Sequence, residues 1–235
     1  MGYKKIILYC CFLFVTESLI QTVWAYIPPT QYFFKKLSSY RDNLKYVKVT
    51  TALKEASDQE VLFMSETIYA FGSGVLVNRV MDTNGNLVAS TQRSIRDSFT
   101  KAAVADQLLF ESDQSKYFKQ LTTLKSHLDR AGGQIFWILE PQGVAENFFR
   151  LWFLQDSFFV SQIEYPEQKI IRFEQFQEKN NFYFPQKILL IQDDKIEIIE
   201  EFVRIQQGDR KIFEPLDTIR MTDNSLLQSY YEYLR

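Results

Sequence analysis

The chain contains a single histidine, so imidazole acid–base chemistry at neutral pH would depend on His127. Ser126 and Asp129 flank it, which invites comparison with a Ser–His–Asp triad. However, the apolar spacing over residues 116–128 predicts a helix, and side chains this close together along a helix do not face one another. We therefore interpret His127 as an ordinary surface or half-buried side chain.

The acidic residues receive a similarly plain interpretation. Asp193 and Asp194 fall in a predicted hairpin turn, where carboxylates are solvated. Glu197, Glu200 and Glu201 fall on the strand that follows, and we expect its exposed face to carry them. Because nucleophiles, bases and metal ligands are all scarce, the sequence predicts a protein that is not an enzyme and that holds no metal or cofactor.

The first 25 residues have the organisation of an export signal. Lys4 and Lys5 precede an apolar run over residues 6–15, and residues 23–25 end in the small-residue pattern that signal peptidases cut. The apolar run is too short for a permanent membrane span. We therefore expect residues 1–25 to be a cleaved signal peptide, with an uncleaved membrane tether as the alternative.

The composition of the remaining chain narrows its compartment and its partners. Cys10 and Cys11 both lie in the predicted signal, so cleavage would leave a chain without cysteine, which fits a bacterial periplasm. The net charge is −2, and Lys and Arg are scattered rather than clustered. Nucleic-acid binding requires concentrated positive charge, so we expect no nucleic-acid partner.

Short apolar runs and turn residues alternate through the second half of the chain. They predict six extended segments, at residues 134–139, 148–154, 157–165, 169–176, 182–191 and 195–205. The first half predicts a helix over 30–44, strands over 46–53, 60–71, 75–81 and 87–91, and helices over 98–110 and 116–128. Connections this short join antiparallel neighbours, because a parallel crossover needs a dozen or more residues.

These elements predict an α+β fold in which one strongly twisted antiparallel sheet packs helices against one face. We expect residues 26–235 to form a single domain, and a division into two domains at the helical insertion is the alternative. Aromatic residues make up 16% of the chain and occupy both faces of several strands. Each face should then meet something apolar, which could be the core, a partner protein or a hydrophobic ligand.

Local motifs in the closing strands add a family resemblance. Residues 171–176 and 182–188 follow the pattern of a strand, a short loop and then aromatic-x-x-Pro-x-x-Ile, in which Pro185 is the central proline. The apolar run 196–203 is followed by Ile-Phe-Glu-Pro at residues 212–215. These motifs resemble those of the LolA-type outer-membrane lipoprotein carriers and related sorting proteins.

The resemblance implies a strongly curved sheet, an incomplete barrel covered on its concave face by helices. It further implies a periplasmic carrier or chaperone that shelters acyl chains of lipoproteins, or another lipid, between the inner and outer membranes, with transport partners in both. The expected hydrophobic cleft consists of Trp137, Leu151, Phe153, Phe159, Phe173, Ile188, Leu190 and, from the helical insertion, Leu121. We expect the insertion, residues 98–128, to act as a movable cover. The alternative is a non-enzymatic cell-envelope module for protein interaction or lipoprotein sensing with the same fold.

Overall fold

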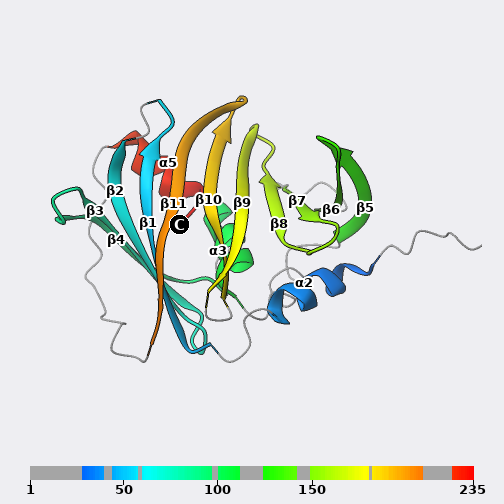
Figure 1. Cartoon of the computed structure of the whole chain (residues 1–235), viewed down its shortest axis with the longest axis horizontal. Helices are drawn as coiled ribbons and strands as arrows, with labels where there is room; N and C mark the ends of the chain where they lie inside the picture. Colours follow the sequence, from blue (N-terminus) through cyan, green and yellow to red (C-terminus); the bar gives the residue numbers. More distant parts are fainter. Residues whose placement is uncertain are drawn as a thin grey trace, which may run out of the picture.

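A computed structural model describes residues 28–39, 44–57, 60–96, 100–111, 124–141, 149–179, 182–208 and 224–235. Within these ranges the chain forms an open antiparallel sheet of eleven strands, accompanied by three helices (Figure 1). The first half contributes α2 (Thr30–Ser38), β1 (Tyr46–Glu55), β2 (Val61–Ala70), β3 (Val75–Asp82), β4 (Leu87–Ser94) and α3 (Lys101–Phe110). The second half contributes β5 (Leu124–Ala131), β6 (Gln134–Pro141), β7 (Arg150–Leu154), β8 (Val160–Glu164), β9 (Lys169–Lys179), β10 (Phe182–Gln192), β11 (Lys195–Gln207) and α5 (Ser225–Tyr233).

The order of strands across the sheet is β4-β3-β2-β1-β11-β10-β9-β8-β7-β6-β5. Two meanders therefore lie side by side, and the pairing of β1 with β11 joins them into one continuous sheet. This confirms the prediction of a large antiparallel sheet built from sequential hairpins. The sheet is open, with β4 and β5 at its edges.

The hairpin between β3 and β4 shows how local sequence sets the register. Gly85 has a φ of +86°, a conformation that glycine adopts without steric cost. The carboxylate of Asp82 accepts hydrogen bonds from the backbone N–H groups of Asn84 and Asn86. The side-chain amide of Asn86 also donates to Asp82, and these bonds lower the pKa of the Asp82 carboxyl. The strands predicted over 75–81 and 87–91 thus form a hairpin.

The helix predicted over residues 116–128 is wrong where the structure describes it. Residues 124–128 belong to β5, which pairs with β6 along its whole length. Gly132 and Gly133 have φ values of +56° and +80° and form the tight turn of the β5–β6 hairpin. Residues 116–123 lie outside the described residues. The preceding helix prediction holds from Lys101 onward, and residues 98–99 are likewise not described.

All three helices contact the same face of the sheet, which we call the helix-facing side. Phe33 of α2 packs on Phe153, and Phe110 of α3 packs on Phe184. Tyr230 of α5 forms a hydrogen bond with Ser65 of β2. Directly opposite residues in an antiparallel pair share a face, and the register connects these positions across the sheet from β7 to β2.

Candidate functional site

The helix-facing side of β6 to β10 is a continuous apolar surface, which we call the apolar half. It includes six of the eight residues predicted for the cleft, each no more than 5% exposed: Trp137, Leu151, Phe153, Phe173, Ile188 and Leu190. The register explains why they meet. Trp137 lies directly opposite Phe153, and Phe173 lies directly opposite Ile188.

The other two predicted cleft residues are placed differently. The ring of Phe159 stacks on Phe176 at 4.7 Å between centroids and lies 5.1 Å from the ring of Tyr183. Tyr183 alternates with Phe182 and Phe184, which face α3, so Phe159 lies on the opposite side of the sheet. Leu121 lies outside the described residues.

Helix α2 lies against one end of the apolar half. Its buried residues Phe33, Phe34 and Leu37 form a stripe along one helix face. The ring of Phe33 sits 5.3 Å from Phe153 and 5.8 Å from Trp137, in tilted and edge-on geometries that aromatic pairs favour. The helix therefore covers surface that would otherwise meet water.

Helix α3 is buried on every side. Its N-cap, Thr100, accepts a hydrogen bond from the backbone N–H of Ala103. Every residue from 102 to 110 is buried, because the helix packs against the sheet on one side and against α5 on another. Phe110 stacks on Phe182 and Phe184 of β10 and so extends the apolar half toward β11.

The helix-facing side of β1 to β4 and β11 holds a cluster of buried polar side chains among apolar core residues, and we call this side the polar half. At its centre the guanidinium of Arg235 is fully buried. Its Nη2 donates to Oε1 of Glu200 at 2.8 Å, its Nη1 donates to Oδ1 of Asp106 at 3.4 Å, and its Nε donates to Oγ1 of Thr67 at 3.1 Å. Asp106 also pairs with Arg93. Desolvation alone would lower the pKa of Arg235, but electrostatic interactions with Glu200, Tyr230 and Asp106 outweigh it and hold the pKa above its ordinary value.

Hydroxyl and amide groups complete the polar half. The hydroxyl of Tyr230 bonds to Ser65 Oγ at 2.8 Å, and Asn78 Nδ2 donates to both Ser65 and Thr67. Burial and the negative charge of Glu200 raise the pKa of the Tyr230 phenol well above its ordinary value. Tyr230 therefore stays neutral at any physiological pH.

This polar half corrects the sequence interpretation of Glu200. We expected a solvated carboxylate, but Glu200 is 1% exposed and faces the helices. Its position in β11 was the available signal, because it shares a face with Ile198 and Phe202 rather than with Glu201. The helix α5 was also missed, although the spacing of Leu227, Tyr230 and Leu234 fits a helical stripe.

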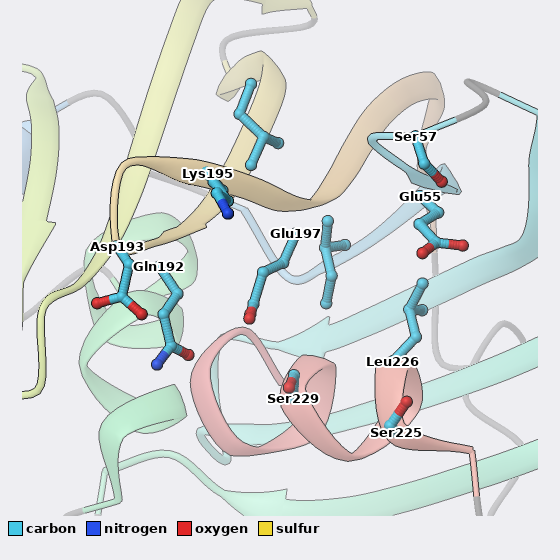
Figure 2. A pocket seen from close by; sticks show the side chains of 11 residues that line it. Glu55, Ser57, Gln192, Asp193, Lys195, Glu197, Ser225, Leu226 and Ser229 are labelled. Atoms are coloured by element: carbon cyan, nitrogen blue, oxygen red, sulfur yellow. The ribbon is translucent and has the colours of Figure 1, made fainter.

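A pocket of about 600 Å³ opens between α5 and the neighbouring ends of β1 and β11 (Figure 2). Eleven residues line it: Glu55, Ser57, Gln192, Asp193, Lys195, Ile196, Glu197, Ile198, Ser225, Leu226 and Ser229. Figure 2 shows Glu197 pointing toward the helix that carries Ser229, with Leu226 on the same helix below Glu55. Carboxylates, hydroxyls and aliphatic side chains thus share one opening beside α5.

The single histidine lies on the side of the sheet opposite the apolar half, because His127 pairs with Ile138, which alternates with Trp137. His127 is half-exposed on edge strand β5, with Nδ1 3.7 Å from a carboxylate oxygen of Glu140. Ser126 is its neighbour on the same strand, so the two side chains point to opposite faces, and Ser126 donates to the backbone oxygen of Pro28. Among the described residues, no group of His, Cys, Asp and Glu is arranged to hold a metal, and no helix has the length and apolarity to span a membrane.

Comparison with known proteins gives the fold a family context. No family model and no curated protein matches the sequence. Among solved structures, the LolA superfamily protein NE2245 from Nitrosomonas europaea aligns with 80% of this chain and 99% of its own, at 13% identity and a TM-score of 0.53. A DUF1329 family protein from Desulfovibrio piger aligns with 80% of this chain and 98% of its own, at 10% identity and a TM-score of 0.45. The chain thus has a LolA-type fold, as the sequence motifs indicated.

Proposed function

We propose that this protein is a non-enzymatic periplasmic carrier or chaperone that shelters acyl chains of lipoproteins, or of another lipid, on the helix-facing side of its sheet. In this proposal residues 1–25 are a cleaved export signal, and residues 26–235 form one domain whose sheet presents its concave face to the helices. The observation that carries the proposal is the apolar half, where strands from β6 to β10 present a contiguous aromatic and aliphatic surface under a short helix. The LolA-type fold supports it.

The apolar half suits an acyl chain because its binding energy requires no polar anchor. Each methylene moved from water onto such a surface contributes about 0.8 kcal/mol. Phe33 and Phe34 of α2 cover part of this surface, so an acyl chain must displace these two rings to contact Phe153. The helix therefore exchanges one set of apolar contacts for another when a ligand enters.

This assigns the role of cover to α2 rather than to the insertion at residues 98–128. Within that insertion, α3 is buried throughout and residues 124–128 are hydrogen-bonded into the sheet. Helix α2, in contrast, exposes Lys35 and Lys36 on the side away from the sheet. A helix packed on one side only is displaced at lower cost than one enclosed on all sides.

Lipid content and lipid uptake test the proposal together. Protein purified from its own host should carry acyl species detectable by native mass spectrometry, and delipidated protein should bind a fluorescent fatty acid. Phe33→Ala should accelerate uptake of the fatty acid, because it removes the ring that α2 inserts against Phe153 and Trp137. Lys36→Ala, on the exposed side of the same helix, serves as the control. The proposed carrier function would be refuted if the purified protein contained no acyl species and no variant took up the fatty acid.

A second candidate is a lipoprotein-sensing or protein-interaction module, favoured by the aromatic cluster on the other side of the sheet. Phe159, Phe176 and Tyr183 stack there and remain partly exposed. Partly exposed aromatic clusters are typical of protein interfaces. Phe176→Lys should then abolish binding to a co-purifying partner protein and leave fatty-acid uptake unchanged. If the protein is only a carrier, Phe176→Lys should change neither partner binding nor fatty-acid uptake.

A further inference from the structure

The polar half contains a site built around one cation. Glu200 and Asp106 contact the guanidinium of Arg235, and both carboxylates are fully buried at the side chain. The rings of Phe110 and Tyr230 have their centroids 5.7 Å and 6.0 Å from the guanidinium carbon. Two carboxylates and two aromatic faces around a positive charge are the arrangement that proteins use to bind organic cations.

The cation in this site comes from α5 and not from the sheet. Arg235 lies two residues beyond the end of α5. This segment contacts the strands through hydrogen bonds, between Tyr230 and Ser65 and from Arg235 to Thr67, and it also buries Leu227 and Leu234 in the core. When α5 leaves, a ligand must therefore replace both kinds of contact, the hydrogen bonds with its head group and the apolar packing with its alkyl chain. The pocket of about 600 Å³ beside Ser225 and Ser229 already separates one side of α5 from β11.

Without Arg235 the site would carry an excess negative charge. Asp106 would keep its partner Arg93, while Glu200 would keep only the hydroxyl of Thr51, which donates at 2.7 Å. The second carboxylate oxygen of Glu200, Oε2, accepts no hydrogen bond from any residue the structure describes. A buried carboxylate in that condition either takes up a proton or pairs with a cation.

The site is also continuous with the apolar half. Glu200 of β11 lies directly opposite Ile188 of β10, and both side chains face the helices. Ile188 in turn lies opposite Phe173 of β9. A molecule with a charged head at Glu200 could therefore extend an alkyl chain along the apolar half without crossing the sheet.

We propose that Arg235 occupies, within the same molecule, the place of a ligand's cationic head group. An amphiphile with an ammonium head displaces α5, pairs its head with Glu200 and lays its chain on the apolar half. This inference rests on the proposed function, because the apolar half must accept the chain. It adds to that function the class of ligand and the element that must leave.

Calorimetric titration with four probes tests the inference, with the two ionic amphiphiles kept below their micellar concentrations and the alcohol below its solubility limit. Dodecylammonium and dodecanoate share a chain and differ in head charge, dodecanol has a neutral head, and ethylammonium has the charged head without the long chain. The proteins are wild type, Arg235→Gln, and Glu200→Gln combined with Arg235→Gln. The control combines Lys54→Gln with Glu201→Gln, which removes an ion pair of 2.6 Å from the other face of the same strand.

In Arg235→Gln, dodecylammonium should bind at least about tenfold more tightly than in wild type, because the competing internal cation is gone, while dodecanoate should gain nothing. In the variant that lacks both Glu200 and Arg235, the preference for ammonium over carboxylate should disappear. The control should behave as wild type. In wild type, dodecylammonium should also speed backbone hydrogen exchange across residues 225–235, as α5 leaves.

Three results would overturn the inference and leave the proposed function standing. They are equal affinity of Arg235→Gln for the ammonium, carboxylate and alcohol probes, binding of ethylammonium as tight as that of dodecylammonium, and unchanged exchange in α5 when dodecylammonium is bound. If none of the long-chain probes binds any variant, the proposed function fails and the inference fails with it.

Discussion

Replacement of Phe153 by alanine separates a structural role of the apolar half from a binding role. Phe153 is fully buried, and its ring lies 5.3 Å and 6.5 Å from the rings of Phe33 and Phe34 on α2. Truncating a buried phenylalanine to alanine costs about 3–5 kcal/mol of stability. The void left behind lies on the surface that we expect an acyl chain to occupy.

An acyl chain bound in this void should therefore restore part of the stability that Phe153→Ala loses. Three or four methylenes placed in the void would return about 2–3 kcal/mol, at about 0.8 kcal/mol each. The matched control is Phe136→Ala, since Phe136 is 8% exposed and packs edge-on against Trp152 on the other side of the sheet. It should lose stability without being rescued.

Urea unfolding of both variants, with and without saturating dodecanoate, measures these free energies directly. We expect a ligand-dependent gain for Phe153→Ala that exceeds the gain for wild type, and no excess gain for Phe136→Ala. Equal rescue of the two variants would mean that dodecanoate binds elsewhere. Absence of rescue in Phe153→Ala would mean that acyl chains do not reach the apolar half, and would refute the reasoning.

Three further predictions concern particular contacts. Gly74→Ala should cost about 1–2 kcal/mol more than Gly72→Ala in urea unfolding, because Gly74 has a φ of +69° and an added Cβ would lie 2.6 Å from Arg96 Cδ, whereas Gly72 has open space. Thr100→Ala should cost about 1 kcal/mol by the same measurement and Thr100→Ser much less, because serine retains the hydroxyl that caps α3. Burial, followed by hydrogen bonding to Glu167, raises the pKa of Tyr233 from the ordinary value of 10.0 to about 12. Its stabilising contribution is therefore complete below pH 10 and is lost as the pH rises toward 12, so Tyr233→Phe should flatten the decline of stability measured by unfolding at pH 9 to 12.

The hairpins were predictable because their signals are local. The β3–β4 turn depends on the positive φ of Gly85 and on Asp82, which accepts hydrogen bonds from the backbone N–H groups of Asn84 and Asn86. The pairing of β1 with β11 brings together residues about 150 positions apart, such as Thr51 and Glu200. No local pattern specifies such a partner, so the sequence predicted one sheet without predicting this seam.

The error at β5 has a specific physical cause. Leu124 and Leu128 are four residues apart, a spacing that fits one face of a helix and equally one face of a strand. In the structure Leu128 lies opposite Trp137, and the hydrogen bonds of the β5–β6 hairpin decide between the two. Pairing with β6 therefore determines that residues 124–128 form a strand, and the sequence of these residues alone does not distinguish a strand from a helix.

The candidate site was predictable in its apolar half only, and for a related reason. Trp137, Phe153 and Ile188 were predictable as buried because their side chains are large and apolar. Strand alternation places them on one face. Glu200 and Arg235 were not predictable as buried, because charged residues are almost always exposed unless they are paired, and this pairing joins β11 to a residue just beyond α5.

The two halves of the helix-facing side make different contributions to recognition. An apolar surface binds any amphiphile in proportion to the area that it buries, so by itself it ranks ligands by chain length and not by head group. A buried carboxylate such as Glu200 discriminates, because a ligand that removes Arg235 without supplying a cation leaves the charge unpaired, and breaking a buried pair costs about 3–5 kcal/mol. Since a buried ion pair adds little net stability compared with apolar packing, selection among head groups is the role that our proposal gives to the polar half.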